Sequence, residues 1–211
     1  MRVAVIGANG RTGTKVVEQA LGRGHHVTAI ARRPEEVTLR HERLTVCQAD
    51  ALDAAAVARS LADATAVIST LGVGTSRAPT TLYSRGTANV LAAMRTRGIR
   101  SLAVVSAAPA GPRAEQPFLE RRLAMPILDR FFGATYEDMR RMEEELGESG
   151  VDWVALRPPR LVGRGATGHY RLDARKPLPK ARSLTYADLA AALLDSLDRP
   201  ELSGATAYVA N

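Results

Sequence analysis

Short apolar runs alternate with longer amphipathic segments along most of the chain. The runs that read as strands buried on both faces of a sheet lie at residues 3–6, 27–31, 44–47, 66–69, 102–106 and 153–156. Between them, apolar residues recur at helical spacing, which predicts helices over residues 12–22, 54–62, 81–97, 136–148 and 186–198. A short final strand is expected at residues 206–209.

This alternation predicts an α/β fold, a doubly wound parallel sheet with helices on both faces. The 211 residues contain no evident linker or internal repeat, so we expect a single domain over residues 1–211. Asp53 and Thr185 stand where two predicted helices begin. Their side chains are suited to cap the backbone N–H groups that a helix start leaves free.

The turn after the first predicted strand reads G-x-x-G-x-x-G over residues 7–13. Glycines at this spacing let the backbone turn sharply, approach a phosphate closely and pack the next helix against the strand. The start of that helix offers free N–H groups and a positive dipole end to an anion. The motif therefore predicts a Rossmann-like site for the pyrophosphate of a dinucleotide. The alternative is a glycine-rich connection that binds nothing.

The end of the second predicted strand indicates which dinucleotide binds. An acidic residue there would bind the ribose hydroxyls of NAD, but this chain has Ala31 followed by Arg32 and Arg33. A guanidinium can grip a 2′-phosphate and stack on adenine, and Arg11 adds a second charge nearby. We therefore expect NADP(H) rather than NAD(H), the alternative being an ordinary basic loop.

Two further strand ends are expected at the same crevice, because ligands of such sheets bind beyond the carboxyl ends of the strands. Asp50 is expected to accept a hydrogen bond from an adenine amino group, or else to cap the next helix, where Asp53 is better placed. Small residues at positions 69–74 would let the dinucleotide cross the sheet edge.

Charge and composition narrow the range of partners. The formal net charge is +7, but the arginines are spread through the chain with no basic block and little aromatic interleaving. We therefore expect no nucleic-acid partner, and a basic surface that attracts anionic cofactors and substrates. No apolar run approaches the roughly 20 residues of a membrane span, so no membrane partner is expected.

The sequence gives little support for a secreted protein, a disulfide, a metal site or a hydrolase. The chain begins directly in a predicted strand and shows no signal peptide, so we expect a cytoplasmic protein. Cys47 is the single cysteine and cannot form an intrachain disulfide. His25 and His26 are adjacent, without ligand partners at useful spacing, so no metal site is expected. The G-x-S-x-G turn of many hydrolases is absent from the sequence.

Taken together, these residues resemble the atypical short-chain dehydrogenase/reductase superfamily. The resemblance is to its NAD(P)H-binding branch, which includes NmrA-like proteins and flavin reductase/biliverdin reductase B. It covers almost the whole chain and rests on residues 7–13, 32, 50, 69–72, 86–90, 105–107 and 149–159.

The resemblance implies a set of cofactor contacts that run from the phosphates to the nicotinamide. Contacts at the phosphates would come from Gly7, Asn9, Gly10, Arg11, Thr12 and Gly13, and Arg32 would meet the 2′-phosphate. The remaining implied contacts are Asp50 and Ala51 at adenine, Leu71 and Gly72 at the ribose, and Ser106, Pro158, Pro159, Arg160 and Leu161 at the nicotinamide.

In flavin reductase-like relatives, a hydride passes from NADPH to a flat conjugated acceptor. The resemblance therefore implies an NADPH-dependent reductase of a flavin, quinone or related carbonyl compound. The phenylalanines and arginines of residues 111–134 suit a small-molecule substrate that is aromatic or anionic. Two alternatives stay open: an NmrA-like protein that senses NADP(H) and contacts a protein partner, and a biosynthetic isomerase, dehydratase or cyclase. We expect a monomer or a homodimer.

Two residues are candidates for the chemistry. Many short-chain dehydrogenases use a Tyr-x-x-x-Lys pair, and the lookalike here joins Tyr136 to Arg140, whose charge would favour a tyrosinate. Otherwise Tyr136 starts a helix and packs against the sheet. Ser106 is the best candidate for a polar contact to substrate or nicotinamide; otherwise it makes a backbone hydrogen bond at a strand end.

Two segments are expected to select the substrate. Residues 111–134 contain all three phenylalanines, Phe118, Phe131 and Phe132, and follow the fifth predicted strand on the cofactor side. They are expected to form a cap over the substrate, the alternative being a helix packed on the core or on a second subunit. Residues 157–180 are expected to form a substrate-side loop, with His169 and Tyr170 near the mouth of the site.

Overall fold

The computed structural model describes residues 1–74, 76–115, 122 and 125–211. Its strands are β1 (Arg2–Ile6), β2 (His26–Ala31), β3 (Leu44–Gln48), β4 (Ala66–Ser69), β5 (Ser101–Val105), β6 (Asp152–Arg157), β7 (Arg160–Val162), β8 (Arg171–Asp173), β9 (Ser183–Thr185) and β10 (Ala205–Ala210). Its α-helices are α1 (Arg11–Gly22), α2 (Ala54–Ser60), α3 (Leu82–Arg97), α4 (Met125–Gly147) and α5 (Tyr186–Ser196).

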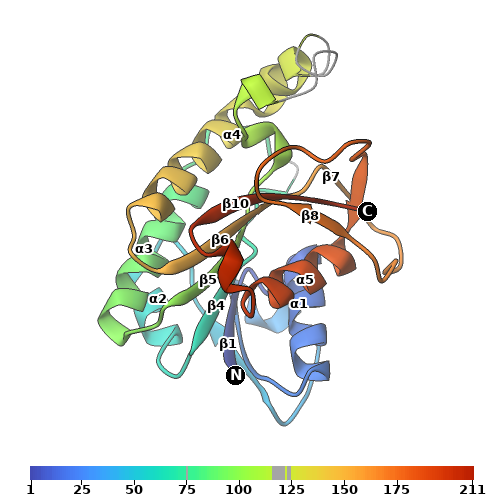
Figure 1. Ribbon diagram of the computed structural model, residues 1–211. Helices are drawn as coiled ribbons and strands as arrows, with labels where there is room; N and C mark the ends of the chain where they lie inside the picture. The colour runs from blue at the N-terminus through green and yellow to red at the C-terminus, as the bar shows by residue number, and fades with distance from the viewer. Residues whose placement is uncertain (75, 116–121, 123–124) are drawn as a thin grey trace.

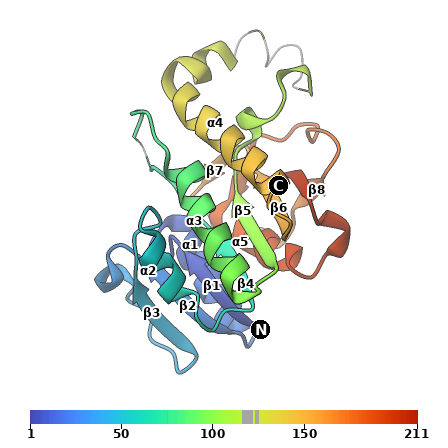
Figure 2. The same ribbon diagram turned by 90° about the vertical axis from the view of Figure 1, so that its left-hand side faces the viewer.

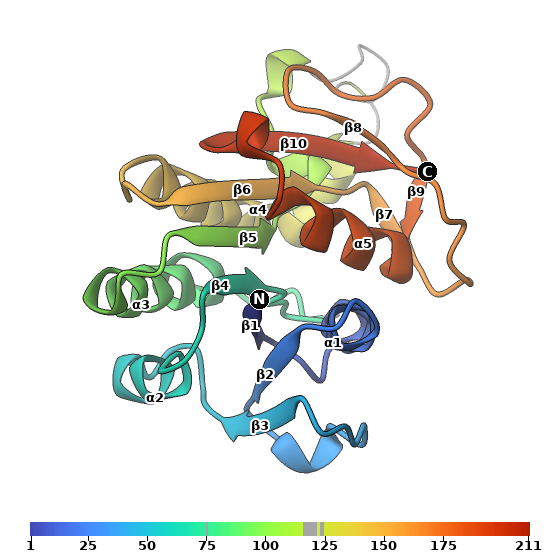
Figure 3. The same ribbon diagram turned by 60° about the horizontal axis from the view of Figure 1, so that its bottom comes forward.

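An eight-stranded sheet runs through the molecule (Figure 1), and its strand order is β3-β2-β1-β4-β5-β6-β10-β8 (Figure 3). From β3 to β10 the neighbouring strands pair in parallel, and β8 adds an antiparallel edge. The chain winds outward from β1 to β3 and then crosses over to β4, so the strand order reverses between β1 and β4. In a doubly wound sheet, a ligand crevice opens at this point.

Helices cover both faces of the sheet (Figure 3). On one face α1 and α5 pack together, with Val16 and Leu193 fully buried between helix and sheet. On the other face α2, α3 and α4 contribute Val57, Met94 and Met142 to a second buried cluster. Burying each such side chain stabilises the fold by about 1.5–3 kcal/mol. The predicted fold class is confirmed.

Both predicted helix caps are present. The Asp53 carboxylate accepts hydrogen bonds from the backbone N–H groups of Ala55 and Ala56 at the start of α2. The Thr185 hydroxyl accepts the N–H of Asp188 at the start of α5. Each bond satisfies a donor that the helix itself cannot pair, typically worth about 1 kcal/mol.

Helix α4 is longer than the sequence pattern indicates. It starts at Met125 rather than at residue 136, and its first turns project beyond the rest of the molecule (Figure 2). Pro126 lies in the first turn, where a proline is tolerated because its missing N–H would have no partner there. Phe131 is exposed although it lies in the helix, which weakens the helical apolar pattern in this stretch.

The strands β7, β8 and β9 were not predicted either. Each is three residues long, too short to show an alternating pattern. β7 and β9 pair in parallel to form a separate two-stranded sheet, which places residues 160–162 beside the start of α5. Within the described ranges, no helix is long and apolar enough to cross a membrane.

Candidate functional site

A cleft of about 800 Å³ opens along the carboxyl ends of the parallel strands. Its walls come from the strand ends and the segments that follow them: residues 6, 7 and 9–12 at β1, 30–32 at β2, 49–51 at β3, 70–74 at β4, 105–107 at β5 and 158–161 at β6. Leu82 and Tyr83 of α3, Phe132, Tyr136 and Met139 of α4, and Tyr186 of α5 complete the lining.

The glycine turn is shaped by close backbone contacts. Gly7 has φ +79°, and a Cβ there would lie 2.9 Å from the carbonyl oxygen of Thr70. A Cβ on Gly13 would lie 2.2 Å from the carbonyl oxygen of Gly7, which is closer than real atoms approach. Gly13 does not line the cleft. It acts instead by letting α1 pack against the turn and β4.

The start of α1 faces the cleft with its N–H groups open. Gly10 is the N-cap and has no side chain to offer, and the first turn holds no acidic residue. The helical hydrogen bonds begin with the N–H of Thr14, which donates to the Gly10 carbonyl at 2.9 Å. Arg11 and Thr12, just before it, line the cleft. This arrangement fits a pyrophosphate, because the helix start supplies free N–H donors and a positive dipole end.

The two arginines after β2 have different surroundings. Arg32 lines the cleft. Arg33 does not; its guanidinium forms an ion pair with Glu36 at 2.6 Å. The side-chain amide of Asn9 donates to the other oxygen of Glu36 at 2.8 Å. The structure therefore brings Arg32, and not Arg33, to the place where the sequence predicts the 2′-phosphate.

Arg11 is turned toward α5. Its guanidinium lies 4.9 Å from the ring centroid of Tyr186, the first residue of that helix. A cation over an aromatic face is attracted by the ring quadrupole and keeps its charge available at the edge of the cleft. The sequence pattern did not single out Tyr186, because only the tertiary packing of α1 on α5 brings it to the site.

Local hydrogen bonds hold the part of the cleft where the sequence predicts adenine. Asp50 lines it, and its Oδ1 accepts the backbone N–H of Leu52 at 2.9 Å. Asn89 of α3 donates its side-chain amide to the carbonyl of Ala51 at 2.9 Å, which ties this loop to the helix. Leu71 and Gly72 line the neighbouring stretch after β4.

At the other end of the cleft, Ser106 is joined to a buried ion pair. Its hydroxyl donates to Oε1 of Glu143 on α4 at 2.7 Å. Arg157, at the end of β6, binds the same carboxylate through Nε at 3.0 Å and Nη2 at 2.6 Å. Both charged side chains are 9% exposed. Burial lowers the pKa of Arg157, but its bonds to Glu143 outweigh that effect and raise it.

Glu143 and Arg157 were not predicted as site residues. Helical spacing could have pointed to Glu143, because it lies seven residues after Tyr136 and therefore on the same face of α4. The alternative role for Ser106 is partly present, because its backbone N–H donates to the Leu156 carbonyl. Its hydroxyl, however, bonds to Glu143.

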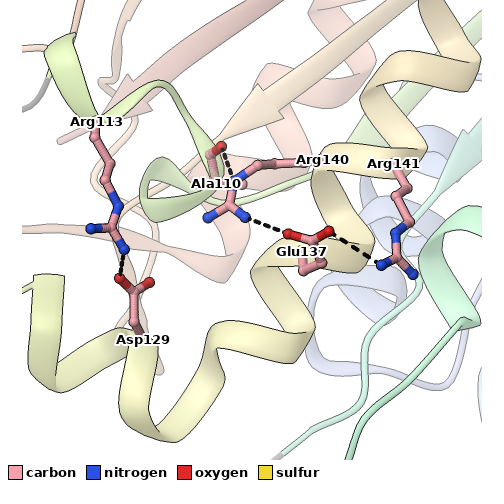
Figure 4. Close-up of polar contacts among 6 residues, drawn as sticks. All are labelled: Ala110, Arg113, Asp129, Glu137, Arg140 and Arg141. Carbon is pink, nitrogen blue, oxygen red and sulfur yellow. Dashed lines mark hydrogen bonds and ion pairs between the residues drawn. The ribbon is translucent and has the colours of Figure 1, made fainter.

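Tyr136 lines the cleft but does not form the predicted pair with Arg140. Arg140 donates instead to Glu137 at 3.0 Å and to the Ala110 carbonyl at 3.3 Å (Figure 4). Burial raises the pKa of Tyr136, and the charge of Asp129 raises it further. The expectation that Arg140 favours a tyrosinate is therefore wrong, because the environment favours the neutral phenol.

The predicted cap is only partly within the described residues, and Phe118 lies outside them. Phe132 lines the cleft, with its ring centroid 6.3 Å from that of Tyr136. Arg77, from the loop before α3, lies over the rings of Phe131 and Phe132 at 4.6 and 5.9 Å. These contacts join the start of α4 to the loop after β4.

Arg113 and Asp129 form an ion pair between the beginning of the predicted cap and α4 (Figure 4). On the substrate-side loop, residues 158–161 reach the cleft, but His169 and Tyr170 do not line it. The Tyr170 hydroxyl donates to Asp195 at 2.5 Å, and burial together with this carboxylate raises its pKa to about 12.

Comparison with known proteins identifies the family of this chain. A family described as NAD(P)H-binding matches residues 7–200. The chain is 31% identical over 205 residues to the 3-diazoavenalumate denitrifying reductase of a Streptomyces species, covering 85% of this chain and 65% of that protein. It is 23% identical over 207 residues to the uncharacterised Bacillus subtilis protein YwnB, covering 95% and 94%.

A solved structure of similar fold is a short-chain dehydrogenase/reductase from Veillonella parvula in complex with NADP. It superposes with a TM-score of 0.81 at 18% identity, covering 100% of this chain and 94% of that one. The family match and the reductase among the relatives support an NAD(P)H-dependent oxidoreductase. The predicted likeness to NAD(P)H-binding proteins is confirmed: this chain belongs to the NAD(P)H-binding family and has a Rossmann-like fold.

Proposed function

We propose that the protein is an NADPH-dependent reductase whose acceptor is a flat conjugated molecule, namely a flavin, a quinone or a related carbonyl compound. The observation that carries the proposal is the lining of the cleft beside Ser106. There Phe132, Tyr136 and Met139 of α4 form one wall, and Leu161 of β7 also lines the cleft. Aromatic and thioether side chains offer broad, polarisable apolar surface to a planar ligand.

The polar groups at this end favour an acceptor that needs little acid–base help. The proton of the Ser106 hydroxyl is held by Glu143, and the pKa of Tyr136 is raised by burial. NADPH supplies the hydride when it is bound, so the protein's task is to bind and orient both ligands. Conjugated acceptors spread the resulting negative charge over their own ring system.

The other end of the cleft supports NADPH as the donor. The open start of α1 and the Gly7 turn suit the phosphates. Within the described residues, no carboxylate forms an ion pair with the Arg32 guanidinium, whereas Arg33 is paired with Glu36. An unpaired guanidinium in the cleft is suited to a 2′-phosphate, which it can bind through two parallel hydrogen bonds.

The test is a steady-state assay of NADPH oxidation with a panel of flavins, quinones and enones. We expect at least one flavin or quinone to be reduced faster with the protein than in buffer. Each acceptor is also assayed with heat-denatured protein, which corrects for direct chemical reduction. No acceleration with any acceptor would count against a reductase of this class.

A specific observation favours a second candidate, an NADP(H)-sensing binding protein. Ile127 and Phe131 are exposed on the projecting part of α4, one helical turn apart, and form an apolar surface that a protein partner could cover. Saturable NADPH binding without turnover, with a partner lost from pull-downs by an Ile127→Ser/Phe131→Ser variant, would favour this candidate over the reductase.

A further inference from the structure

The Ser106 hydroxyl acts as the donor in its hydrogen bond to Glu143. A serine hydroxyl has one proton to donate and two lone pairs to accept with. Both oxygens of the Glu143 carboxylate accept hydrogen bonds from Arg157, and Oε1 also accepts the 2.7 Å bond from Ser106, which therefore uses the serine proton. Ser106 also lines the cleft. What remains to face a ligand there is therefore an acceptor.

The carboxylate is itself held in place. Arg157 contacts both of its oxygens, and the Nη1 of the same guanidinium donates to the Tyr208 hydroxyl at 3.4 Å. Tyr208 in turn donates to Glu115 at 2.9 Å. A buried charge pair costs desolvation that its mutual attraction only partly offsets. A stabilising role alone therefore accounts poorly for this pair, whereas a positioning role for Ser106 accounts for its place beside the cleft.

We infer that Glu143, anchored by Arg157, is a positioning residue that presents Ser106 to the cleft as a hydrogen-bond acceptor, so that the ligand group bound there is an amide or imide N–H. This inference rests on the proposed function and deepens it. The N–H has two candidate sources, the carboxamide of the nicotinamide or the imide of a flavin acceptor. Ser106 accordingly does not supply a proton to the acceptor.

Matched ligands distinguish the two sources by calorimetric binding. Reduced 3-acetylpyridine adenine dinucleotide phosphate replaces the carboxamide NH₂ of NADPH with a methyl group of similar size. N3-methyllumiflavin replaces the imide N–H of lumiflavin. We expect the protein to bind one of the N–H ligands about tenfold more tightly than its analogue, the effect of one lost hydrogen bond that leaves a buried acceptor unpaired.

The variants assign this preference to Ser106. In Ser106→Ala the ratio of the two dissociation constants should fall close to one. Ser106→Cys keeps most of the side-chain bulk but is a poor acceptor, so it should also lose the preference; a retained preference would mean a steric effect and would overturn the inference. Ser196→Ala is the matched control, because its buried hydroxyl donates to the Leu193 carbonyl within α5. It should keep the ratio of the unmodified protein.

Glu143→Gln tests the positioning role. Its side-chain amide can donate to Ser106 and release the serine proton toward the cleft, so the preference for the N–H ligand should fall several-fold while NADPH still binds. If this variant does not fold, as circular dichroism would show, the Ser106 variants still decide the inference.

Three results would overturn the inference. The first is equal binding of both members of each ligand pair by the unmodified protein. The second is a Ser106→Ala variant whose kcat falls more than about 100-fold while the binding ratio is unchanged, since that loss would identify Ser106 as a proton donor. The third is a protein that binds neither NADPH nor flavin. This last result would overturn the proposed function as well, whereas a reductase without the N–H preference would overturn the inference alone.

Discussion

Among single residues, neighbouring side chains of the same type have different roles at the cleft. Arg32 lines the cleft without a carboxylate partner among the described residues, and Arg33 is neutralised by Glu36. Gly13 and Gly22 both belong to α1, but only Gly13 meets backbone atoms where a Cβ would stand. Such pairs allow each assigned role to be tested against a control of the same residue type.

Replacing Arg32 with alanine should weaken NADPH binding by about 10- to 100-fold and leave NADH binding nearly unchanged. The reason is that a charge-assisted hydrogen bond to a phosphate contributes about 1.5–3 kcal/mol. Arg33→Ala is the control and should change either affinity by less than about threefold. Isothermal titration of both cofactors measures this, and equal losses of NADPH and NADH affinity in Arg32→Ala would refute the assignment.

Replacing Gly13 with alanine should destabilise the protein and impair dinucleotide binding. Its Cβ would overlap the Gly7 carbonyl, so α1 must shift away from the turn, at a cost of about 1–3 kcal/mol. Gly22→Ala meets no atom within 4 Å and should leave the free energy of unfolding unchanged or raise it by up to about 1 kcal/mol. Urea denaturation of both variants gives the comparison; equal stability would contradict the packing role of Gly13.

Among the elements, buried carboxylates hold loops to helices. Asp138 of α4 accepts the N–H of Tyr83 at 2.8 Å and the hydroxyl of Ser84 at 2.5 Å, so it caps the start of α3 from another helix. Asp188 binds Thr167 and the side-chain amide of Asn211. It thereby fixes the loop that follows β7 and the end of β10 to the start of α5.

The Asp188 contacts predict a pH-dependent contribution to stability. Burial alone would raise the pKa of Asp188, but hydrogen bonds from Thr185, Thr167 and Asn211 outweigh it and lower the pKa below the ordinary value of 3.8. The unfolded chain therefore binds this proton more readily. The contribution of the Asp188 charge to the free energy of unfolding is complete at pH values above 3.8. It is lost as the pH falls through the lower pKa of the folded state.

Asp188→Asn should therefore be less stable than the unmodified protein by about 1–3 kcal/mol near pH 7, because an amide cannot accept all of these bonds. The difference in unfolding free energy should shrink below pH 3.8. Urea denaturation at a series of pH values measures it. A difference that stays constant down to pH 3 would show that the Asp188 charge contributes nothing.

Some of these elements can be predicted from the sequence, and others cannot. The strands of the parallel sheet and the glycine turn were predictable because buried strands and a phosphate-binding turn each impose a local pattern. The first eleven residues of α4 were not, because Phe131 is exposed and breaks the pattern. Glu143 and Arg157 were missed for a different reason: helical spacing places Glu143 on the same face of α4 as Tyr136, but the pairing of Glu143 with Arg157 depends on the tertiary packing of α4 and β6.

For the whole molecule, the sheet acts as a platform with two separately packed faces. Apolar clusters on both faces pack against β1 and β4, so the crevice at their carboxyl ends is built on two buried strands. The loop after β3, which lines the cleft, is tied to α3 through Asn89. A rigid platform of this kind keeps a cofactor site preorganised, and the net charge of +7 attracts an anionic dinucleotide to it.

The most direct test of this account is equilibrium binding of NADPH and NADH to the unmodified protein. Calorimetric titration should show saturable binding of NADPH with a stoichiometry near one per chain, at least about tenfold tighter than NADH, as expected for one 2′-phosphate bound by Arg32. Equal affinities would contradict the assignment of Arg32. Absence of saturable binding of either dinucleotide would contradict the account as a whole.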